Sequence, residues 1–356
     1  MTATAGPLAG DPEGSRAEPI VALTATEVSW RHRHLLDLDV VSWPEIELVM
    51  HTADSMKEIL SRPIAKVPAL RGRNVTILFY EASTRTRVSF EVAAKNLSAD
   101  VVNISASASS VTKGESLVDT IRTLEALGAQ MLVMRHGVSG APYLAAEVFS
   151  GSVLNGGDGW HAHPTQALLD LYTLRERLPG GSLVGRKVVI LGDILHSRVA
   201  RSNIWSLTAA GADLWLCGPS TLLHGLDAWA RHGAAGRRFT VTSGVDAALR
   251  DADVVMALRI QKERMSGGLL PSLREYAARF GLTRERLAVA KPDALVMHPG
   301  PMNEGVEIAA DVATMDRSVI TTQVTNGVAV RMALLYLMAG VAPPHHPVAG
   351  GEGGPA

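Results

Sequence analysis

Short apolar runs alternate with amphipathic segments of helical length between about residue 30 and residue 340. Each run is mostly apolar and mostly β-branched, as is typical of strands covered on both faces of a parallel sheet. Strands that alternate with amphipathic helices indicate α/β layers. The predicted strands span residues 75–80, 101–104, 130–134, 188–191, 214–217, 254–258 and 294–297.

The length of the chain indicates two domains, because 356 residues exceed what one ordinary core accommodates. We expect two doubly wound α/β domains, each with a central, mainly parallel sheet flanked by helices. The first would span residues 29–165 and the second residues 166–319, with a helix at 320–340 returning to the first. Residues 1–28 and 341–356 are rich in Gly, Pro and Ala, so we expect disordered tails there.

Composition limits the classes of function. The 34 basic and 35 acidic residues give a net charge of -1, so no overall field favours nucleic acid or anionic lipid. The single cysteine, Cys217, excludes an intramolecular disulfide framework and fits a reducing compartment. We find no apolar run of membrane-spanning length and no signal-peptide pattern at residues 1–20. These features predict a soluble cytoplasmic protein.

Basic and polar side chains follow the predicted strands. Ligands of open parallel sheets lie beyond the carboxyl ends of the strands, so these side chains should converge on one cationic crevice. They are the cluster 83–87, Arg135 with His136, His196 with Arg198, Arg259, and His298.

The stretch "ILFYEASTRTRVSFEVAAKNL", residues 77–97, predicts a strand, a short loop and a helix with Ser83 as its N-cap. Val88, Val92, Ala93 and Leu97 form an apolar stripe at helical spacing. Free backbone N–H groups, hydroxyls and arginines at a helix start favour a phosphate site. The alternative is a capped helix with a solvated basic turn. The stretch lacks the G-x-x-x-x-G-K-[ST] loop of nucleoside-triphosphate sites, which favours a small phosphate-bearing molecule.

The segment "FYEASTRTRVSFE" resembles the carbamoyl-phosphate signature of the transcarbamoylase family. Further segments similar to that family follow in the same order. They are "KGESLVDTIRTLEALGAQMLVMRH", "HPTQALLDLYTL", "LGDILHSRVARSN", "RIQKER" and "MHPGPMNEGVEI". The resemblance covers about residues 30–340 and implies transfer of a carbamoyl group without a cofactor.

Two local differences separate the branches of this family. Ornithine enzymes typically carry His-Pro-Cys-Gln and His-Cys-Leu-Pro segments, whereas this chain has "HPTQ" at 163–166 and "HPGP" at 298–301. The resemblance therefore favours L-aspartate as the acceptor and N-carbamoyl-L-aspartate, a pyrimidine precursor, as the product. Arginine forks suit the two carboxylates of aspartate, and Arg198, Arg259 and Gln261 would bind them.

The resemblance also implies residues that bind the carbamoyl donor. Those for the phosphate are Ser83, Thr84, Arg85 and Thr86. Arg135 and His163 would lie near the carbonyl oxygen, which Thr86 also contacts in the transition state. The acceptors for the carbamoyl amide are Gln166 and the backbone carbonyls around Gly300 and Pro301.

A neighbouring subunit would complete each site. Ser109 and Lys113, in "SSVTKGES", correspond to residues that the family supplies from the next chain of a homotrimer, with Lys113 also near aspartate. The family implies possible regulatory or dihydroorotase partner chains, but no metal, nucleic acid or membrane.

Other interpretations remain open at this stage. The strand-helix-strand unit at 187–218 could bind a dinucleotide, although it lacks G-x-G-x-x-G. His161 and His163 could form half of a metal site. The chain could act on another amino acid, or serve as a catalytically weak scaffold subunit of a larger assembly. Bacterial aspartate enzymes often have arginine where this chain has Glu304, which would reverse a charge near an anion site.

Overall fold

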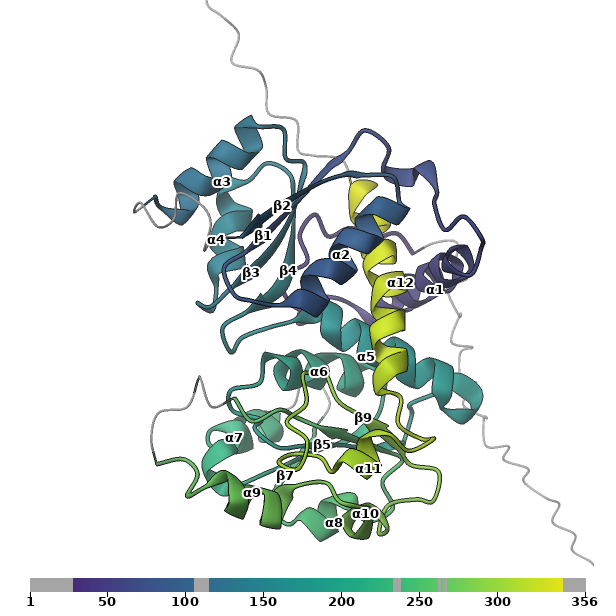
Figure 1. Cartoon of the computed structure of the whole chain (residues 1–356), viewed down its shortest axis with the longest axis vertical. Helices are drawn as coiled ribbons and strands as arrows, with labels where there is room; N and C mark the ends of the chain where they lie inside the picture. Colours follow the sequence, from purple (N-terminus) through teal and green to yellow (C-terminus); the bar gives the residue numbers. More distant parts are fainter. Residues whose placement is uncertain (1–27, 106–114, 233–237, 262–263, 265–267, 342–356) are drawn as a thin grey trace, which may run out of the picture.

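The protein consists of two parallel β-sheets flanked by helices, which form the two lobes of Figure 1. The computed structural model describes residues 28–105, 115–232, 238–261, 264 and 268–341. The predicted fold class, two doubly wound α/β domains, is confirmed. Within these ranges no helix has both the length and the apolar character needed to cross a membrane.

The first sheet has the strand order β2-β1-β3-β4, and every pairing is parallel. Its strands are β1 (Asn74–Phe79), β2 (Asp100–Ser105), β3 (Met131–His136) and β4 (Ser152–Asp158). Side chains alternate between two cores: Ile77 packs in the same core as α1 (Trp43–Leu60) and α2 (Thr84–Asn96). Leu78 packs with α3 (Leu117–Ala126) and α4 (Ala141–Val148) on the other face.

The second sheet has the order β7-β6-β5-β8-β9 and is also parallel. Its strands are β5 (Lys187–Leu191), β6 (Asp213–Cys217), β7 (Thr240–Thr242), β8 (Val254–Ala257) and β9 (Leu295–Met297). One face packs with α6 (Arg198–Ala209) and α7 (Leu226–His232), and the other with α8 (Val245–Leu249), α10 (Arg284–Leu287) and α11 (Ala310–Ala313). Further short elements are helix α9 (Leu273–Phe280) and the 3-10 helices Pro68–Leu70, Pro179–Gly181 and Ser220–Leu222.

Two helices join the lobes. Helix α5 (Pro164–Arg177) packs against α6 of the second lobe, and α12 (Ile320–Ala339) crosses back to pack on α5, α1 and α2 (Figure 1). Most of α12 from Ala329 to Leu335 is fully buried, which explains why it is apolar nearly all round. The two lobes therefore share one continuous core.

Three expectations about local structure need correction. Strands β4 and β7 were not predicted, because β4 contains Asn155-Gly156-Gly157 and β7, with the sequence Thr-Val-Thr, has only one apolar residue. Strand β2 is an edge strand whose Val102 is 42% exposed, so it is not covered on both faces. On α2, the buried face comprises Thr86, Phe90, Ala93 and Ala94, whereas Val88 and Val92 of the predicted stripe are exposed.

Candidate active site

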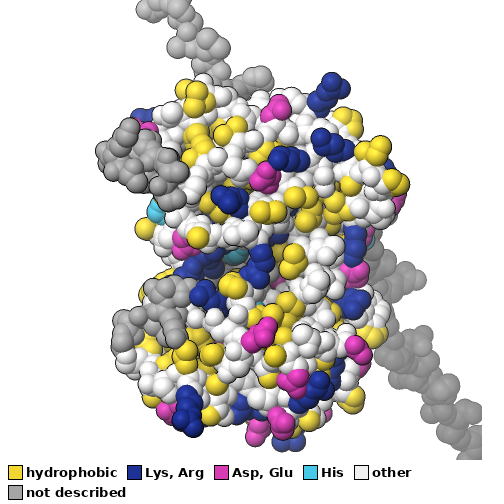
Figure 2. Space-filling model, viewed as in Figure 1, with side chains coloured by type: hydrophobic (Ala, Val, Ile, Leu, Met, Phe, Trp, Pro, Cys, Tyr) yellow, Lys and Arg dark blue, Asp and Glu magenta, His cyan; other side chains and the backbone are white. Residues whose placement is uncertain are grey.

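A cleft of about 970 Å³ lies between the lobes, beyond the carboxyl ends of β1, β3, β5, β8 and β9. It brings together twelve of the residues that the sequence singled out: Ser83, Thr84, Arg85, Thr86, Arg135, His163, Gln166, Arg198, Arg259, Gln261, Gly300 and Pro301. Ser109 and Lys113 lie outside the described residues. Figure 2 shows basic side chains gathered in the hollow at the waist of the molecule.

The charge in this cleft is strongly unbalanced. In the described part of the chain, Glu81 is the only acidic residue that lines it. The arginines that line it are Arg85, Arg135, Arg198, Arg259, Arg264 and Arg331. Such a concentration of positive charge in a concave site attracts anions and favours ligands with more than one negative group.

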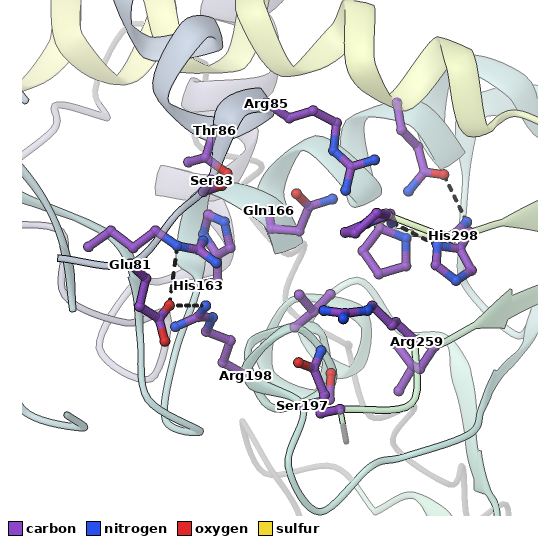
Figure 3. Close-up of a pocket in the computed structure, with 18 of the residues that line it drawn as sticks. Glu81, Ser83, Arg85, Thr86, His163, Gln166, Ser197, Arg198, Arg259 and His298 are labelled. Atoms are coloured by element: carbon purple, nitrogen blue, oxygen red, sulfur yellow. Dashed lines mark hydrogen bonds and ion pairs between the residues drawn. The ribbon is translucent and has the colours of Figure 1, made fainter. Parts of the chain in front are cut away.

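The start of α2 forms the upper wall of the cleft. Ser83 is the N-cap and Thr86 is buried in the first turn, so hydroxyl groups and first-turn amides lie at the positive end of the helix dipole. The side chain of Arg85 extends from this turn to Gly300 on the facing loop (Figure 3). A Cβ atom built on Gly300, whose φ is +64°, would meet the Arg85 guanidinium.

The guanidinium groups of Arg85 and Arg259 face each other across the cleft. Burial lowers the pKa of Arg85, and the charge of Arg259 lowers it further. Arg85 comes from the first lobe, whereas Arg259 follows β8 in the second. An anion bound between these two side chains would relieve their repulsion.

Glu81 joins three of the arginines. Its carboxylate accepts hydrogen bonds from Arg198 Nη2 at 2.6 Å and Arg264 Nη2 at 3.5 Å, and lies 3.3 Å from Arg135 Nε (Figure 3). Burial acts to raise the pKa of Glu81, but Arg198, Arg135 and Arg264 outweigh it and hold this pKa below its usual value. Glu81 therefore stays ionised and connects the first lobe to the second.

Arg135 and Arg198 both contact this carboxylate and lie close to each other at Gly157. Arg135 Nη1 donates to the Gly156 carbonyl at 3.0 Å, and burial together with Arg198 lowers the pKa of Arg135 to about 9. Arg198 is 4% exposed. Both side chains press on Gly157, where a Cβ would lie 3.0 Å from Arg135 Nη1 and from Arg198 Nε. Gly157 of β4 thus makes room for the two arginines.

His163 is held from the second lobe. It is the N-cap of α5, and its backbone N–H donates to Ser202 Oγ of α6 at 2.9 Å. Burial lowers the pKa of His163 well below its ordinary value, and Arg135, Arg331 and Arg198 lower it further. The imidazole is therefore neutral at physiological pH. Its Nδ1 has no hydrogen-bond partner among the described residues.

The loop after β9 supplies the opposite wall. His298 Nδ1 accepts from the Gly300 N–H at 2.7 Å, and His298 Nε2 lies 3.3 Å from Glu307. Because Nδ1 accepts a hydrogen bond, the proton of the neutral ring belongs on Nε2, toward Glu307. Held by Glu307, His298 fixes through its hydrogen bond with Gly300 the backbone that carries Gly300 and Pro301 into the cleft.

Several predictions about single residues were wrong or incomplete. His136 and His196 do not line the cleft: the ring of His136 packs at a tilt against that of Tyr80, and His196 pairs with Asp193 at 2.9 Å. Arg331 was not predicted, although it lines the cleft, where its Nη1 donates to Ser89 Oγ at 2.8 Å. Glu304 is exposed and is not among the lining residues.

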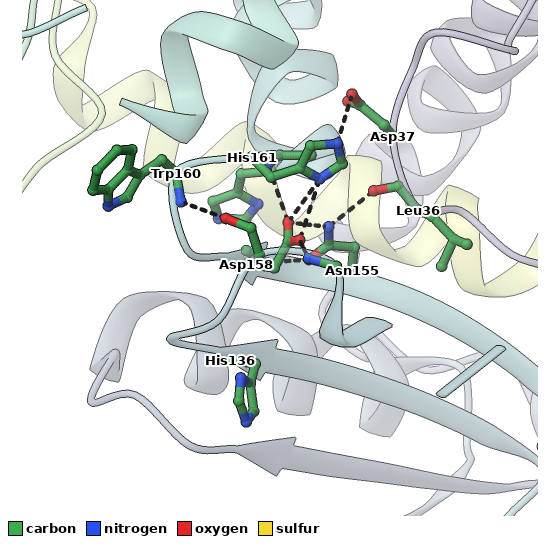
Figure 4. Close-up of polar contacts among 12 residues, drawn as sticks. Leu36, Asp37, His136, Asn155, Asp158, Trp160 and His161 are labelled. Carbon is green, nitrogen blue, oxygen red and sulfur yellow. Dashed lines mark hydrogen bonds and ion pairs between the residues drawn. The ribbon is translucent and has the colours of Figure 1, made fainter. Parts of the chain in front are cut away.

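A cluster of polar side chains surrounds Asp158 and His161 (Figure 4). Asp158 is fully buried and accepts hydrogen bonds from Gly140 N–H at 2.7 Å, Asn155 Nδ2 at 2.7 Å and Ala162 N–H at 3.0 Å. The ring of His161 lies between Asp158, at 3.2 Å from Nδ1, and Asp37, at 4.0 Å from Nε2.

Asp37 links this cluster to the active-site histidine. Burial raises the pKa of Asp37 to about 6, and Ser202 Oγ donates to its carboxylate at 3.0 Å. The same hydroxyl accepts the backbone N–H of His163. His161 therefore acts in this polar network. The described residues contain no group of three or more His, Cys, Asp or Glu side chains placed to hold a metal ion.

His161→Gln should destabilise the protein more at pH 6 than at pH 9. The hydrogen bond to Asp158 raises the pKa of His161, and Asp158 and Asp37 add attraction for the charged ring. A group whose pKa rises on folding stabilises the fold below its ordinary pKa, about 6.5, and loses this effect as pH rises through the folded value. Urea unfolding of both proteins at the two pH values measures the difference. The exposed His224→Gln serves as control, and an equal loss at both pH values for His161→Gln would contradict the account.

Comparisons with known proteins agree with this geometry. Residues 33–176 match the family described as aspartate/ornithine carbamoyltransferase, carbamoyl-P binding domain, and residues 184–338 match its Asp/Orn binding domain. The aspartate carbamoyltransferase catalytic subunit of Roseiflexus sp. strain RS-1 is 63% identical over 310 residues, which cover 87% of this chain and 96% of the relative.

Two solved structures show a similar fold. Aspartate transcarbamoylase from Trypanosoma cruzi, in complex with carbamoyl phosphate, matches with a TM-score of 0.76 and 31% identity, covering 86% of this chain and 96% of that one. Ornithine carbamoyltransferase from Pyrococcus furiosus matches with a TM-score of 0.75 and 28% identity, covering 88% and 100%. The fold alone therefore does not separate an aspartate site from an ornithine site.

Proposed function

Because the chain belongs to the aspartate/ornithine carbamoyltransferase family, we propose that its cleft transfers the carbamoyl group of carbamoyl phosphate to L-aspartate. The products are N-carbamoyl-L-aspartate and phosphate. The charge of the cleft is the observation that favours aspartate over ornithine as the acceptor. The one acidic residue that lines it in the described part of the chain, Glu81, is engaged by three arginines. No carboxylate is left there for the distal amine of ornithine, whereas the arginines suit a dicarboxylate.

We assign carbamoyl phosphate to the first lobe, residues 29–165. The start of α2 offers its phosphate the groups of Ser83, Thr84, Arg85 and Thr86. Arg135 and His163 also line the cleft, and we assign them to the carbonyl oxygen. Gln166 and the carbonyls of Gly300 and Pro301 accept from the amide.

We assign L-aspartate to the second lobe, residues 166–319. Arg259 and Gln261 follow β8 and line the cleft opposite α2. Arg198 lies deeper, with Nη2 on Glu81 and with Nη1 buried and lacking a hydrogen-bond partner among the described residues. A carboxylate of aspartate would supply that partner.

The transfer needs no covalent enzyme intermediate. The neutral α-amine of aspartate attacks the carbamoyl carbon, and negative charge develops on the carbonyl oxygen, where Thr86, Arg135 and neutral His163 donate hydrogen bonds. The bond to the bridging oxygen then breaks, with Arg85 stabilising the charge on the departing phosphate, which takes the amine proton. Most of the rate arises from holding the two substrates in line and neutralising charge.

An assay of product formation tests this function. The purified chain, supplied with carbamoyl phosphate and L-aspartate, should form N-carbamoyl-L-aspartate and phosphate in equal amounts. Phosphate release that does not depend on aspartate would contradict the proposal.

We place the reaction in the cytoplasm, in agreement with a chain whose single cysteine is free and buried. We place the product among the precursors of pyrimidines.

We further propose that the protein is a homotrimer with shared sites, alone or with regulatory or dihydroorotase chains. The segment "SASASSVTKGES" is polar and rich in small residues, which suits a loop that reaches a neighbouring chain. Exposed apolar side chains on neighbouring elements support a subunit contact: Val88 and Val92 on α2 are 46% and 38% exposed, and Val102 on β2 is 42% exposed.

Mixing two inactive variants should restore activity if sites are shared. In a random equal mixture of Arg85→Ala and Lys113→Ala chains, a site works only if its main chain keeps Arg85 and its neighbour keeps Lys113. About a quarter of the sites of a closed ring meet both conditions. The measurement is turnover after subunit exchange, with each variant alone as control. Turnover no higher than that of the two parents would remove Ser109 and Lys113 from the shared site and leave the transferase activity in place.

A further inference from the structure

A fully buried carboxylate, Asp170, lies on α5 one turn after Gln166, and the proposed mechanism does not use it. Its Oδ1 accepts hydrogen bonds from Gln166 Nε2 at 2.9 Å and from Gln323 Nε2 at 2.7 Å. Its Oδ2 accepts from Asn203 Nδ2 at 2.9 Å. Three side-chain amides therefore converge on one carboxylate. They come from α5, α12 and α6, helices that meet at the junction of the lobes (Figure 1).

The charge of Asp170 decides how these amides are oriented. Burial raises its pKa to about 6, although hydrogen bonds from Asn203, Gln323 and Gln166 oppose this and Arg331 is also near. The group is therefore mainly ionised at neutral pH. An ionised carboxylate only accepts hydrogen bonds, so each amide must turn its NH2 group toward Asp170 and its carbonyl oxygen away.

The oxygens of two of these amides, those of Gln323 and Gln166, are turned toward the wall of the cleft. Gln323 Oε1 accepts the backbone N–H of His298 at 3.1 Å, next to the loop that carries Gly300 and Pro301. Gln166 lines the cleft near His163, with 9% of its surface exposed, and its Nε2 is held by Asp170 (Figure 3). Its Oε1 is left as an acceptor on the cleft side.

We propose that Asp170 is a positioning residue that sets donor specificity: it holds Gln166 with its carbonyl oxygen toward the cleft, so that the cleft selects a donor bearing an NH2 group. This inference rests on the proposed function. A donor with a methyl group in place of NH2, such as acetyl phosphate, leaves the oriented acceptor without a partner. Sites built to bind an N–H group discriminate against ligands that lack it, because a buried acceptor is left unpaired.

A purely structural role for Asp170 predicts a different result. If the network only holds α5, α6 and α12 together, loss of the carboxylate would weaken the binding of both donors equally. If Asp170 acts through Gln166, its loss frees the amide to turn. Binding of carbamoyl phosphate would then fall, while binding of acetyl phosphate would change little.

The test compares Asp170→Ala with the wild-type chain. We expect the KM for carbamoyl phosphate to rise about tenfold, the size that one hydrogen bond supports. The inhibition constant of acetyl phosphate in the same assay should stay within about twofold. Asn203→Ala is the matched control, because the Asn203 side-chain amide donates to the other oxygen of Asp170, Oδ2, and not to the oxygen that holds Gln166. It should leave the ratio of the two constants unchanged. If Asp170→Ala does not fold, Asp170→Ser takes its place in the test, because serine retains a small polar group that is too short to hold Gln166.

A double-mutant cycle with Gln166→Ala completes the test. Once Gln166 is absent, Asp170→Ala should cause no further change in the ratio of the two constants. Equal weakening of both donors, the same loss in Asn203→Ala, or additive effects in the cycle would overturn the inference. A wild-type chain that forms no carbamoyl aspartate would overturn the proposed function and this inference with it. A wild-type chain that transfers the group, with no selective loss in the Asp170 variants, overturns the inference alone.

Discussion

Arg85→Ala should lower the turnover number by on the order of a hundredfold or more while leaving the fold intact, as loss of a charge partner of the transition state does. Arg85 is exposed in the cleft at the start of α2, so its removal leaves no cavity in a core. It lies against Gly300 and faces Arg259 across the cleft. A phosphate leaving between the lobes would meet this guanidinium first.

The measurement is kcat with both substrates saturating, together with circular dichroism and thermal unfolding to establish the fold. Arg87→Ala is the matched control, because Arg87 lies on the same helix two residues away but does not line the cleft. Its turnover should stay within about twofold of the wild-type value. A folded Arg85→Ala protein with nearly normal turnover would remove Arg85 from the phosphate site.

Arg259→Ala should raise the KM for aspartate far more than the KM for carbamoyl phosphate. Charged hydrogen bonds from an arginine to a carboxylate contribute about 1.5 to 3 kcal/mol each, which corresponds to a change of about ten- to a hundredfold. Arg259 follows β8 in the second lobe, opposite the start of α2. Steady-state kinetics with each substrate varied in turn separates the two constants.

Arg274→Ala provides the control for Arg259, since Arg274 is exposed on α9 of the same lobe and does not line the cleft. Both KM values should be unchanged in that variant. Equal increases of both constants in Arg259→Ala would contradict the assignment of aspartate to the second lobe. They would instead indicate a general loss of positive potential.

All seven strands that the sequence predicted are present, and each coincides with a mostly apolar run. Strands β1, β5 and β8 fall within one residue of the predicted limits, because buried parallel strands need unbroken apolar side chains. Strand β4 has the opposite character, since Asn155, Gly156 and Gly157 interrupt its apolar run, and Gly157 leaves room for two arginines. Residues that the site requires therefore replace the apolar pattern by which this strand could have been predicted.

The candidate site was predictable where function is concentrated in short motifs, such as Ser83 to Thr86 at a helix start. It was not predictable where a role depends on distant partners. Glu81 lies within the segment "FYEASTRTRVSFE", but Arg198 and Arg264 belong to the other lobe and reach it only in the folded chain. Asp170 and Gln323 are 153 positions apart, and no local pattern reveals that they share a hydrogen bond.

The most direct test of the central claim is a competition between acceptors. The purified chain is given carbamoyl phosphate with equal concentrations of L-aspartate and L-ornithine, and the carbamoylated products are identified by mass. A cleft whose acid Glu81 is engaged by arginines should form N-carbamoyl-L-aspartate and essentially no carbamoylated ornithine. Formation of carbamoylated ornithine as the main product, or of neither product, would contradict the account.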